Sequence, residues 1–151
     1  MGAVRRLGGR ADAHLTTLFP PVRPRRWLEI RYLDAVSDDL WPAVVFTLVT
    51  LLDDARLSQI AWEATESVAT AWDQAARVGL ADPRLREAAV RCVQAAADVA
   101  PADVADSMDR LLRQVTRGRS AADDFADRVV AHGIDAAIAG LASDDRLKGG
   151  A

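Results

Sequence analysis

Glu29 and Arg31 are the two residues whose types and spacing best suit chemistry. They lie two positions apart within residues 27–34, a stretch rich in the β-prone residues Trp, Ile and Tyr. Such a stretch predicts a strand, along which both side chains project from one face, roughly 6–7 Å apart along the backbone. The carboxylate is a hard oxygen ligand that suits magnesium, and the guanidinium matches phosphate oxygens. The pair therefore indicates either a metal-and-phosphate site or an exposed ion pair, which is the commoner arrangement at this spacing.

The predicted strand needs partners to hold this pair in place. Its other face carries Leu28, Ile30 and Tyr32, which we expect to pack on helices. Residues 14–19 are the expected partner strand, and the proline-rich residues 20–24 are the expected stiff connection, because proline fixes φ and cannot donate a ladder hydrogen bond. A two-stranded hairpin is marginal alone, so it requires helices or further strands.

The whole run around this pair resembles a family signature. The sequence HLTTLFPPVRPRRWLEIRYLDA, from His14 onward, is similar to the signature of the plant-type glutamate–cysteine ligases (glutamate–cysteine ligase type 2 family). It most resembles the bacterial branch that makes γ-glutamylcysteine for ergothioneine biosynthesis. The later runs DDLWPAVVFTLVTLLDD and ADDFADRVVAHGI are similar to that branch too, so the resemblance extends to the last predicted helix.

The resemblance implies roles for the two residues. The family's glutamate that matches Glu29 is a magnesium ligand, and the arginine that matches Arg31 contacts the γ-phosphate of ATP and the phosphate being transferred. The family uses ATP to activate the γ-carboxylate of glutamate as an acyl phosphate, which the cysteine amine then attacks. ATP and magnesium are thus the expected cofactors, and glutamate and cysteine the expected substrates. Arg23, Thr16 and Thr17 are weaker candidates for the same pocket, with turn or strand structure as their alternative role.

The chain also departs from the family. Members are several hundred residues long, and most of their metal, nucleotide and glutamate ligands precede the region that this chain resembles. We therefore expect the C-terminal segment of a larger α+β enzyme whose antiparallel sheet is glutamine-synthetase-like. On that expectation the isolated chain is inactive and the missing N-terminal ligase region is a partner. Two alternatives stay open: a non-catalytic helical module that scaffolds a partner, and a related ligase that joins glutamate to another amine.

Composition excludes several classes of protein. With 151 residues, half of them hydrophobic, the chain is long enough for one domain with a core. The first 34 residues carry seven arginines against three acids, a net of +4, so the total of −3 leaves −7 for the rest and argues against nucleic-acid binding. The single cysteine excludes an internal disulfide and fits a reducing compartment. Since the start lacks a signal-like apolar stretch and the apolar run 40–52 is too short to span a bilayer, we expect a cytoplasmic protein without membrane contact.

The domain organisation follows from the pattern of caps and apolar spacing. We predict a mainly α fold, with a flexible lead-in at 1–12, a β-hairpin at 13–35, a bundle of about five helices at 36–142 and a disordered tail at 143–151. The apolar helix 40–52 should be buried on every side. A second helix over 55–78 should stop at Gly79, and later helices should begin near Asp82, Pro101 and Ser120.

Overall fold

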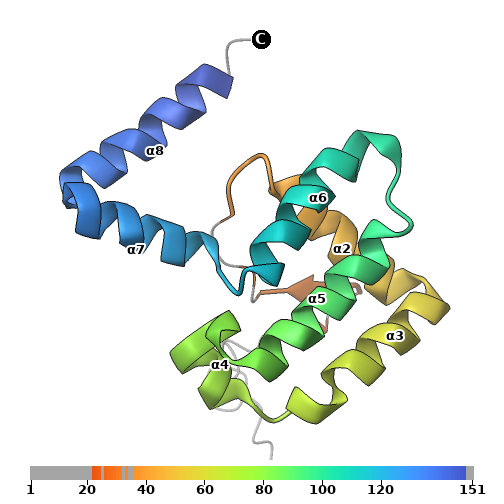
Figure 1. The fold of residues 1–151 in the computed structure, drawn as a ribbon. Coiled ribbons are helices and arrows are strands. Elements are labelled where there is room, and N and C mark those ends of the chain that lie inside the picture. Colours follow the sequence, from red (N-terminus) through yellow and green to blue (C-terminus); the bar gives the residue numbers. More distant parts are fainter. Residues whose placement is uncertain (1–21, 25, 32, 34–35, 149–151) are drawn as a thin grey trace, which may run out of the picture. The chain divides into compact units, whose positions relative to one another are not determined.

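The chain divides into two compact units, Met1–Ala35 and Val36–Ala151. The computed structural model describes residues 22–24, 26–31, 33 and 36–148 (Figure 1). In the first unit, strands β1 (Val22–Pro24) and β2 (Leu28–Ile30) form an antiparallel pair. The described part of the second unit is helical. The predicted mainly α fold with an N-terminal hairpin is therefore confirmed.

The hairpin differs from the prediction in which residues pair. Val22 lies opposite Ile30, and Pro24 lies opposite Leu28, so residues predicted as a connection form strand β1. Pro24 is tolerated because it is the last residue of its strand, where a missing N–H costs little. The predicted partner strand 14–19 lies outside the described residues. Strand β2 is shorter than predicted, and Leu28 exposes 61% of its surface.

The second unit contains more and shorter helices than predicted. Among the described residues, seven α-helices and two 3₁₀ turns occur where about five helices were expected. They are α2 (Trp41–Asp53), α3 (Ala55–Thr65), η1 (Glu66–Val68), α4 (Trp72–Val78), η2 (Gly79–Ala81), α5 (Pro83–Ala97), α6 (Ala102–Thr116), α7 (Ala121–His132) and α8 (Ile134–Lys148).

Two breaks account for the difference in helix number. The predicted helix 55–78 stops after Thr65, where a run rich in Ser, Thr and Val disfavours helix and Thr65 donates its hydroxyl hydrogen to the Ala61 carbonyl at 2.8 Å. The last predicted helix is divided by Gly133, whose φ of +82° ends α7. Helix α8 then continues to Lys148, so the backbone of 143–148 is helical where the sequence predicts a disordered tail.

The predicted helix starts and the first stop are confirmed. The Asp82 carboxylate accepts a hydrogen bond from the Arg84 backbone N–H at 2.8 Å, with proline at the first helical position of α5. Ser120 and Asp123 form a reciprocal capping box at the start of α7. The hydrogen bonds that Ser120 donates hold the pKa of Asp123 below its ordinary value. Gly79, at φ +50°, follows the last residue of α4.

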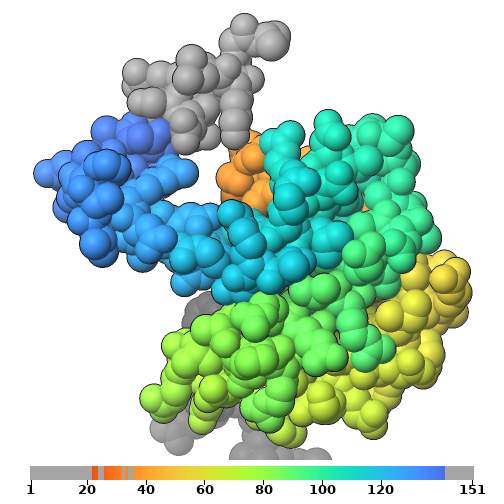
Figure 2. Space-filling model, in the orientation of Figure 1, coloured from red at the N-terminus to blue at the C-terminus, as the bar shows by residue number. Residues whose placement is uncertain are grey.

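The hydrophobic core lies where α2, α5 and α6 meet, and α5 also contacts α3 (Figure 1). Its centre is Met108, which is 1% exposed and whose sulfur accepts a hydrogen bond from the Thr47 hydroxyl at 3.7 Å. The buried cluster consists of Ala43, Val93, Ala96, Met108 and Val115. Figure 2 shows the side chains of α3, α5 and α6 in continuous contact on the face in view. This packing sets the positions of α2 and α6 relative to each other.

Helix α2 is buried on one side only. Ala43 and Thr47 are its buried residues, so the prediction of a helix covered all round is wrong. Its outer side carries a row of apolar residues at helical spacing, each 39–55% exposed: Trp41, Val45, Val49 and Leu52. None of the helices in the described ranges is both long and apolar enough to cross a membrane.

Candidate functional site

The hairpin brings Arg23, Glu29 and Arg31 together. The strand register places Arg23 directly opposite Glu29, and the two-residue spacing places Arg31 on the same side as Glu29. Glu29 Oε1 lies 3.8 Å from Arg31 Nε, and Glu29 Oε2 lies 3.9 Å from Arg23 Nη1. One carboxylate is therefore flanked by two guanidinium groups. The predicted proximity of Glu29 and Arg31 is observed.

These contacts are ion pairs that exceed hydrogen-bond length. Charge-assisted hydrogen bonds between nitrogen and oxygen measure about 2.7–2.9 Å, roughly 1 Å shorter than the contacts here. The Glu29 side chain is 37% exposed, and those of Arg23 and Arg31 are partly buried. Partly exposed ion pairs each contribute about 0–1 kcal/mol to stability. The Glu29 carboxylate is therefore accessible from solvent, and these two ion pairs by themselves add little to the stability of the hairpin.

The donor set suits a phosphate group and can supply one metal ligand. Two guanidinium groups offer planar forks of N–H donors for phosphate oxygens, and the carboxylate oxygens of Glu29 fit a magnesium ion, which is bound by few protein carboxylates and several waters. Within the described part of the chain, no three or more His, Cys, Asp or Glu residues are grouped so that they could hold a metal ion. The described residues thus fit magnesium through Glu29 alone, and the ion's other ligands must be water, phosphate or other protein groups.

The remaining predicted site residues fall in two classes. Thr16 and Thr17 lie outside the described residues. Arg23, predicted only as a weak candidate, contacts Glu29 as closely as Arg31 does. The sequence could have indicated Arg23 as a neighbour of Glu29 only if residues 22–24 had been assigned to a strand, because the strand register places Arg23 opposite Glu29.

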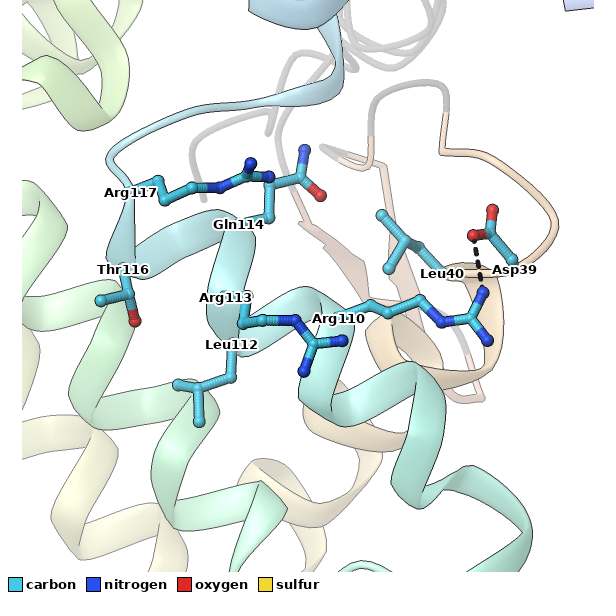
Figure 3. Close-up of a pocket in the computed structure, with 8 residues that line it drawn as sticks. All are labelled: Asp39, Leu40, Arg110, Leu112, Arg113, Gln114, Thr116 and Arg117. Atoms are coloured by element: carbon cyan, nitrogen blue, oxygen red, sulfur yellow. Dashed lines mark hydrogen bonds and ion pairs between the residues drawn. The ribbon is translucent and has the colours of Figure 1, made fainter.

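A second group of polar residues lines a pocket that sequence reasoning missed. The pocket has a volume of about 690 Å³ and lies between the start of α2 and the C-terminal half of α6 (Figure 3). Its lining residues are Asp39, Leu40, Arg110, Leu112, Arg113, Gln114, Thr116 and Arg117. Arginines near the C-terminal end of a helix are ordinarily explained by their interaction with the helix dipole. The spacing of Arg110, Arg113 and Arg117 at i, i+3 and i+7 was the available signal, because it places all three on one side of the helix.

Comparison with known proteins decides the family. The model of glutamate-cysteine ligase family 2 (GCS2) matches residues 1–142. The chain belongs to this family. The resemblance inferred from the sequence is therefore confirmed, and Arg23, Glu29 and Arg31 all lie within the matched range of this family 2 chain.

Curated relatives of this family 2 chain are longer proteins. It is 61% identical over 145 residues to glutamate–cysteine ligase EgtA of Mycolicibacterium smegmatis, an alignment that covers 92% of this chain and 34% of the relative. It is 62% identical over 128 residues to glutamate–cysteine ligase EgtA of Mycobacterium tuberculosis strain H37Rv, covering 85% of this chain and 30% of the relative. The chain thus spans about a third of the length of these relatives. No solved structure matches it significantly.

Proposed function

We propose that the chain is the C-terminal segment of an ATP-dependent glutamate–cysteine ligase that forms γ-glutamylcysteine. Membership of the family and the names of the relatives support the reaction class. The observation that carries the proposal at residue level is the placement of Arg23 and Arg31 on either side of the Glu29 carboxylate. The product would feed ergothioneine biosynthesis in the cytoplasm, and the isolated segment would be inactive.

The proposed reaction assigns each of the three side chains a task. The γ-carboxylate of glutamate attacks the γ-phosphorus of ATP and ADP leaves. The cysteine amine then displaces phosphate from the acyl carbon, losing a proton, to form the amide. Magnesium, when bound, neutralises phosphate charge. Glu29 would be one of its ligands, and Arg31 would hold the transferring phosphoryl group by donating hydrogen bonds to its oxygens. Arg23, across the hairpin, would hold Glu29 in position and add positive charge for the nucleotide phosphates.

The remaining part of the ligase is the proposed partner of this segment. The outer side of α2 exposes four large apolar side chains in a row, an arrangement that marks an interaction surface more often than a free surface. The relatives have about three times the length of the aligned region, so in a complete ligase the additional chain could cover this surface. The proposal assigns the exposed side of α2 to contact with that part of the ligase.

The decisive experiment is steady-state turnover of a complete ligase that carries Glu29→Gln. We expect at least about a hundredfold loss of turnover with an unchanged thermal midpoint, because a metal ligand is lost while two weak ion pairs contribute little to folding. The apparent magnesium affinity should fall as well. Glu87→Gln is the matched control, since Glu87 is an exposed carboxylate of α5 that no proposed task uses.

Turnover and magnesium affinity within about threefold of the unmodified enzyme in the Glu29→Gln variant would contradict the site. A complete ligase that hydrolyses ATP in the presence of glutamate but joins glutamate to an amine other than cysteine would keep the site and change the acceptor. Absence of any glutamate-dependent ATP hydrolysis in the unmodified complete protein would favour a non-catalytic scaffold.

A further inference from the structure

The pocket between α2 and α6 concentrates positive charge in an acidic unit. Arg110, Arg113 and Arg117 extend from α6 toward the side on which Leu40 lies (Figure 3). The residues after position 34 carry a net charge of −7, since the whole chain carries −3 and the first 34 residues carry +4. The wall of the pocket that carries these three guanidinium groups is therefore positively charged, whereas the surrounding unit has a negative net charge.

Two of the three arginines have no side-chain partner among the described residues. The Arg110 guanidinium donates a hydrogen bond to Asp39 Oδ2 at 3.1 Å. Among the described residues, the side chains of Arg113 and Arg117 form neither a hydrogen bond nor an ion pair, and both are exposed. An arginine that pairs with nothing still keeps its charge and its five N–H donors. These two side chains can thus turn their donors to a ligand without breaking an internal contact.

The opposite wall of the pocket is the start of α2. Leu40 occupies the N-cap position, and no side chain caps this helix end. The Trp41 N–H of the first helical turn already donates to the Ser37 carbonyl at 3.0 Å and Pro42 has no N–H, so the arginines are the main donors of this pocket. Asp39 lies at the same wall, but its contact with Arg110 offsets its charge. Leu40 and Leu112 supply apolar surface between the charged groups.

We propose that this pocket binds a small multivalent oxyanion, one that carries two or more phosphate or carboxylate groups. Planar guanidinium forks bind either kind of oxyanion with paired hydrogen bonds, and Arg113 and Arg117 are the groups that contact it. Arg110 is paired with Asp39 at the far end, so the net positive charge of the pocket comes from Arg113 and Arg117. The volume of about 690 Å³ is ample for a metabolite of this class. The proposal is independent of the ligase reaction, because all the residues that carry it belong to the helical unit.

The test is isothermal titration of the 151-residue chain with pyrophosphate and, separately, with citrate at low ionic strength. The double variant Arg113→Gln/Arg117→Gln removes the two contacting guanidinium groups. The double variant Arg77→Gln/Arg91→Gln is the matched control, because it removes the same charge from exposed arginines of α4 and α5 that do not line the pocket. Circular dichroism of each variant verifies that it is folded.

We expect saturable binding of at least one oxyanion by the unmodified chain and the control. Binding to the Arg113/Arg117 variant should be at least about tenfold weaker, since two sets of charge-assisted hydrogen bonds are lost. Tighter binding of pyrophosphate would assign the site to phosphates, and tighter binding of citrate would assign it to carboxylates. Failure of both ligands to saturate the unmodified chain, or equal loss in the two double variants, would overturn the proposal.

Discussion

Replacing Arg31 by lysine separates two roles that its position allows. If Arg31 only balances the charge of Glu29, then lysine serves as well, because the contact is a long ion pair of 3.8 Å in which no bidentate geometry is formed. If Arg31 holds a phosphoryl group, the planar fork matters and lysine, a point charge with no fork, is a poor substitute. The Arg31→Lys variant of the complete ligase therefore tests the fork while keeping the charge.

The two roles predict effects of different size. An ion pair at about 4 Å in a water-like surrounding is worth about 1 kcal/mol, and lysine retains most of it, so the free energy of unfolding should change by less than about 1 kcal/mol. Loss of one charge-assisted hydrogen bond to a phosphoryl oxygen costs about 1.5–3 kcal/mol, which corresponds to a roughly 10- to 150-fold lower kcat/KM for ATP. The kinetic effect should thus exceed the effect on stability.

The assay is steady-state coupled detection of ADP with saturating glutamate and cysteine and varied ATP, alongside urea unfolding of the same preparations. A kcat/KM for ATP within about threefold of the unmodified enzyme in Arg31→Lys would refute the phosphate-holding role. Arg26→Lys is the matched control, since Arg26 is an exposed arginine of the turn that precedes β2. Its kcat/KM should stay unchanged.

Two further predictions concern the helical unit. Gly118 has φ +70°, and a Cβ there would lie 3.0 Å from the Leu80 carbonyl oxygen, so Gly118→Ala should lower the free energy of unfolding by about 1–2 kcal/mol or more. Gly79→Ala should cost less in the same urea titration, because nothing lies within 4 Å of its added Cβ. The folded pKa of Asp123 is lowered by hydrogen bonds from Ser120, so its stabilisation of α7 should be present above the ordinary carboxyl pKa of about 3.9 and lost as the pH falls through the folded pKa. Amide chemical shifts of α7 followed by NMR should show this transition, and an unchanged transition in Asp123→Asn would contradict it.

Local signals in the sequence predicted where helices begin better than where they continue. The starts of α5 and α7 follow from Asp82 with its proline and from the Ser120 capping box, whose partners lie within three residues along the chain. The apolar spacing predicted that the second helix continues beyond Thr65. The spacing of apolar residues does not reflect the low helix propensity of the residues that follow Thr65, where α3 ends. The number of helices was therefore underestimated although most of their starts were located.

Tertiary features were harder to predict because they depend on what a segment contacts. The apolar composition of α2 predicted burial on every side, but the helix packs on α3, α5 and α6 through one face and leaves Trp41, Val49 and Leu52 exposed. Likewise, the proximity of Glu29 and Arg31 follows from the alternation of side chains along one strand. The proximity of Arg23 depends on the pairing of residues 22–24 with β2, and the prolines in this segment indicated a connection instead of a strand. The arginines near the end of α6 share one side of the helix by their spacing, but the pocket that they line forms only where α2 packs against α6.

The long ion pairs of the hairpin are compatible with the proposed phosphate-binding role. A guanidinium in a closed bidentate pair with a carboxylate must break two hydrogen bonds before it can bind phosphate, at a cost of several kcal/mol if the pair is desolvated. At 3.8 and 3.9 Å, with Glu29 over a third exposed, the contacts of Arg31 and Arg23 with Glu29 orient the side chains without that cost. On the proposed function, Arg31 and Arg23 could therefore bind a phosphate without first breaking a bidentate hydrogen-bonded pair with Glu29.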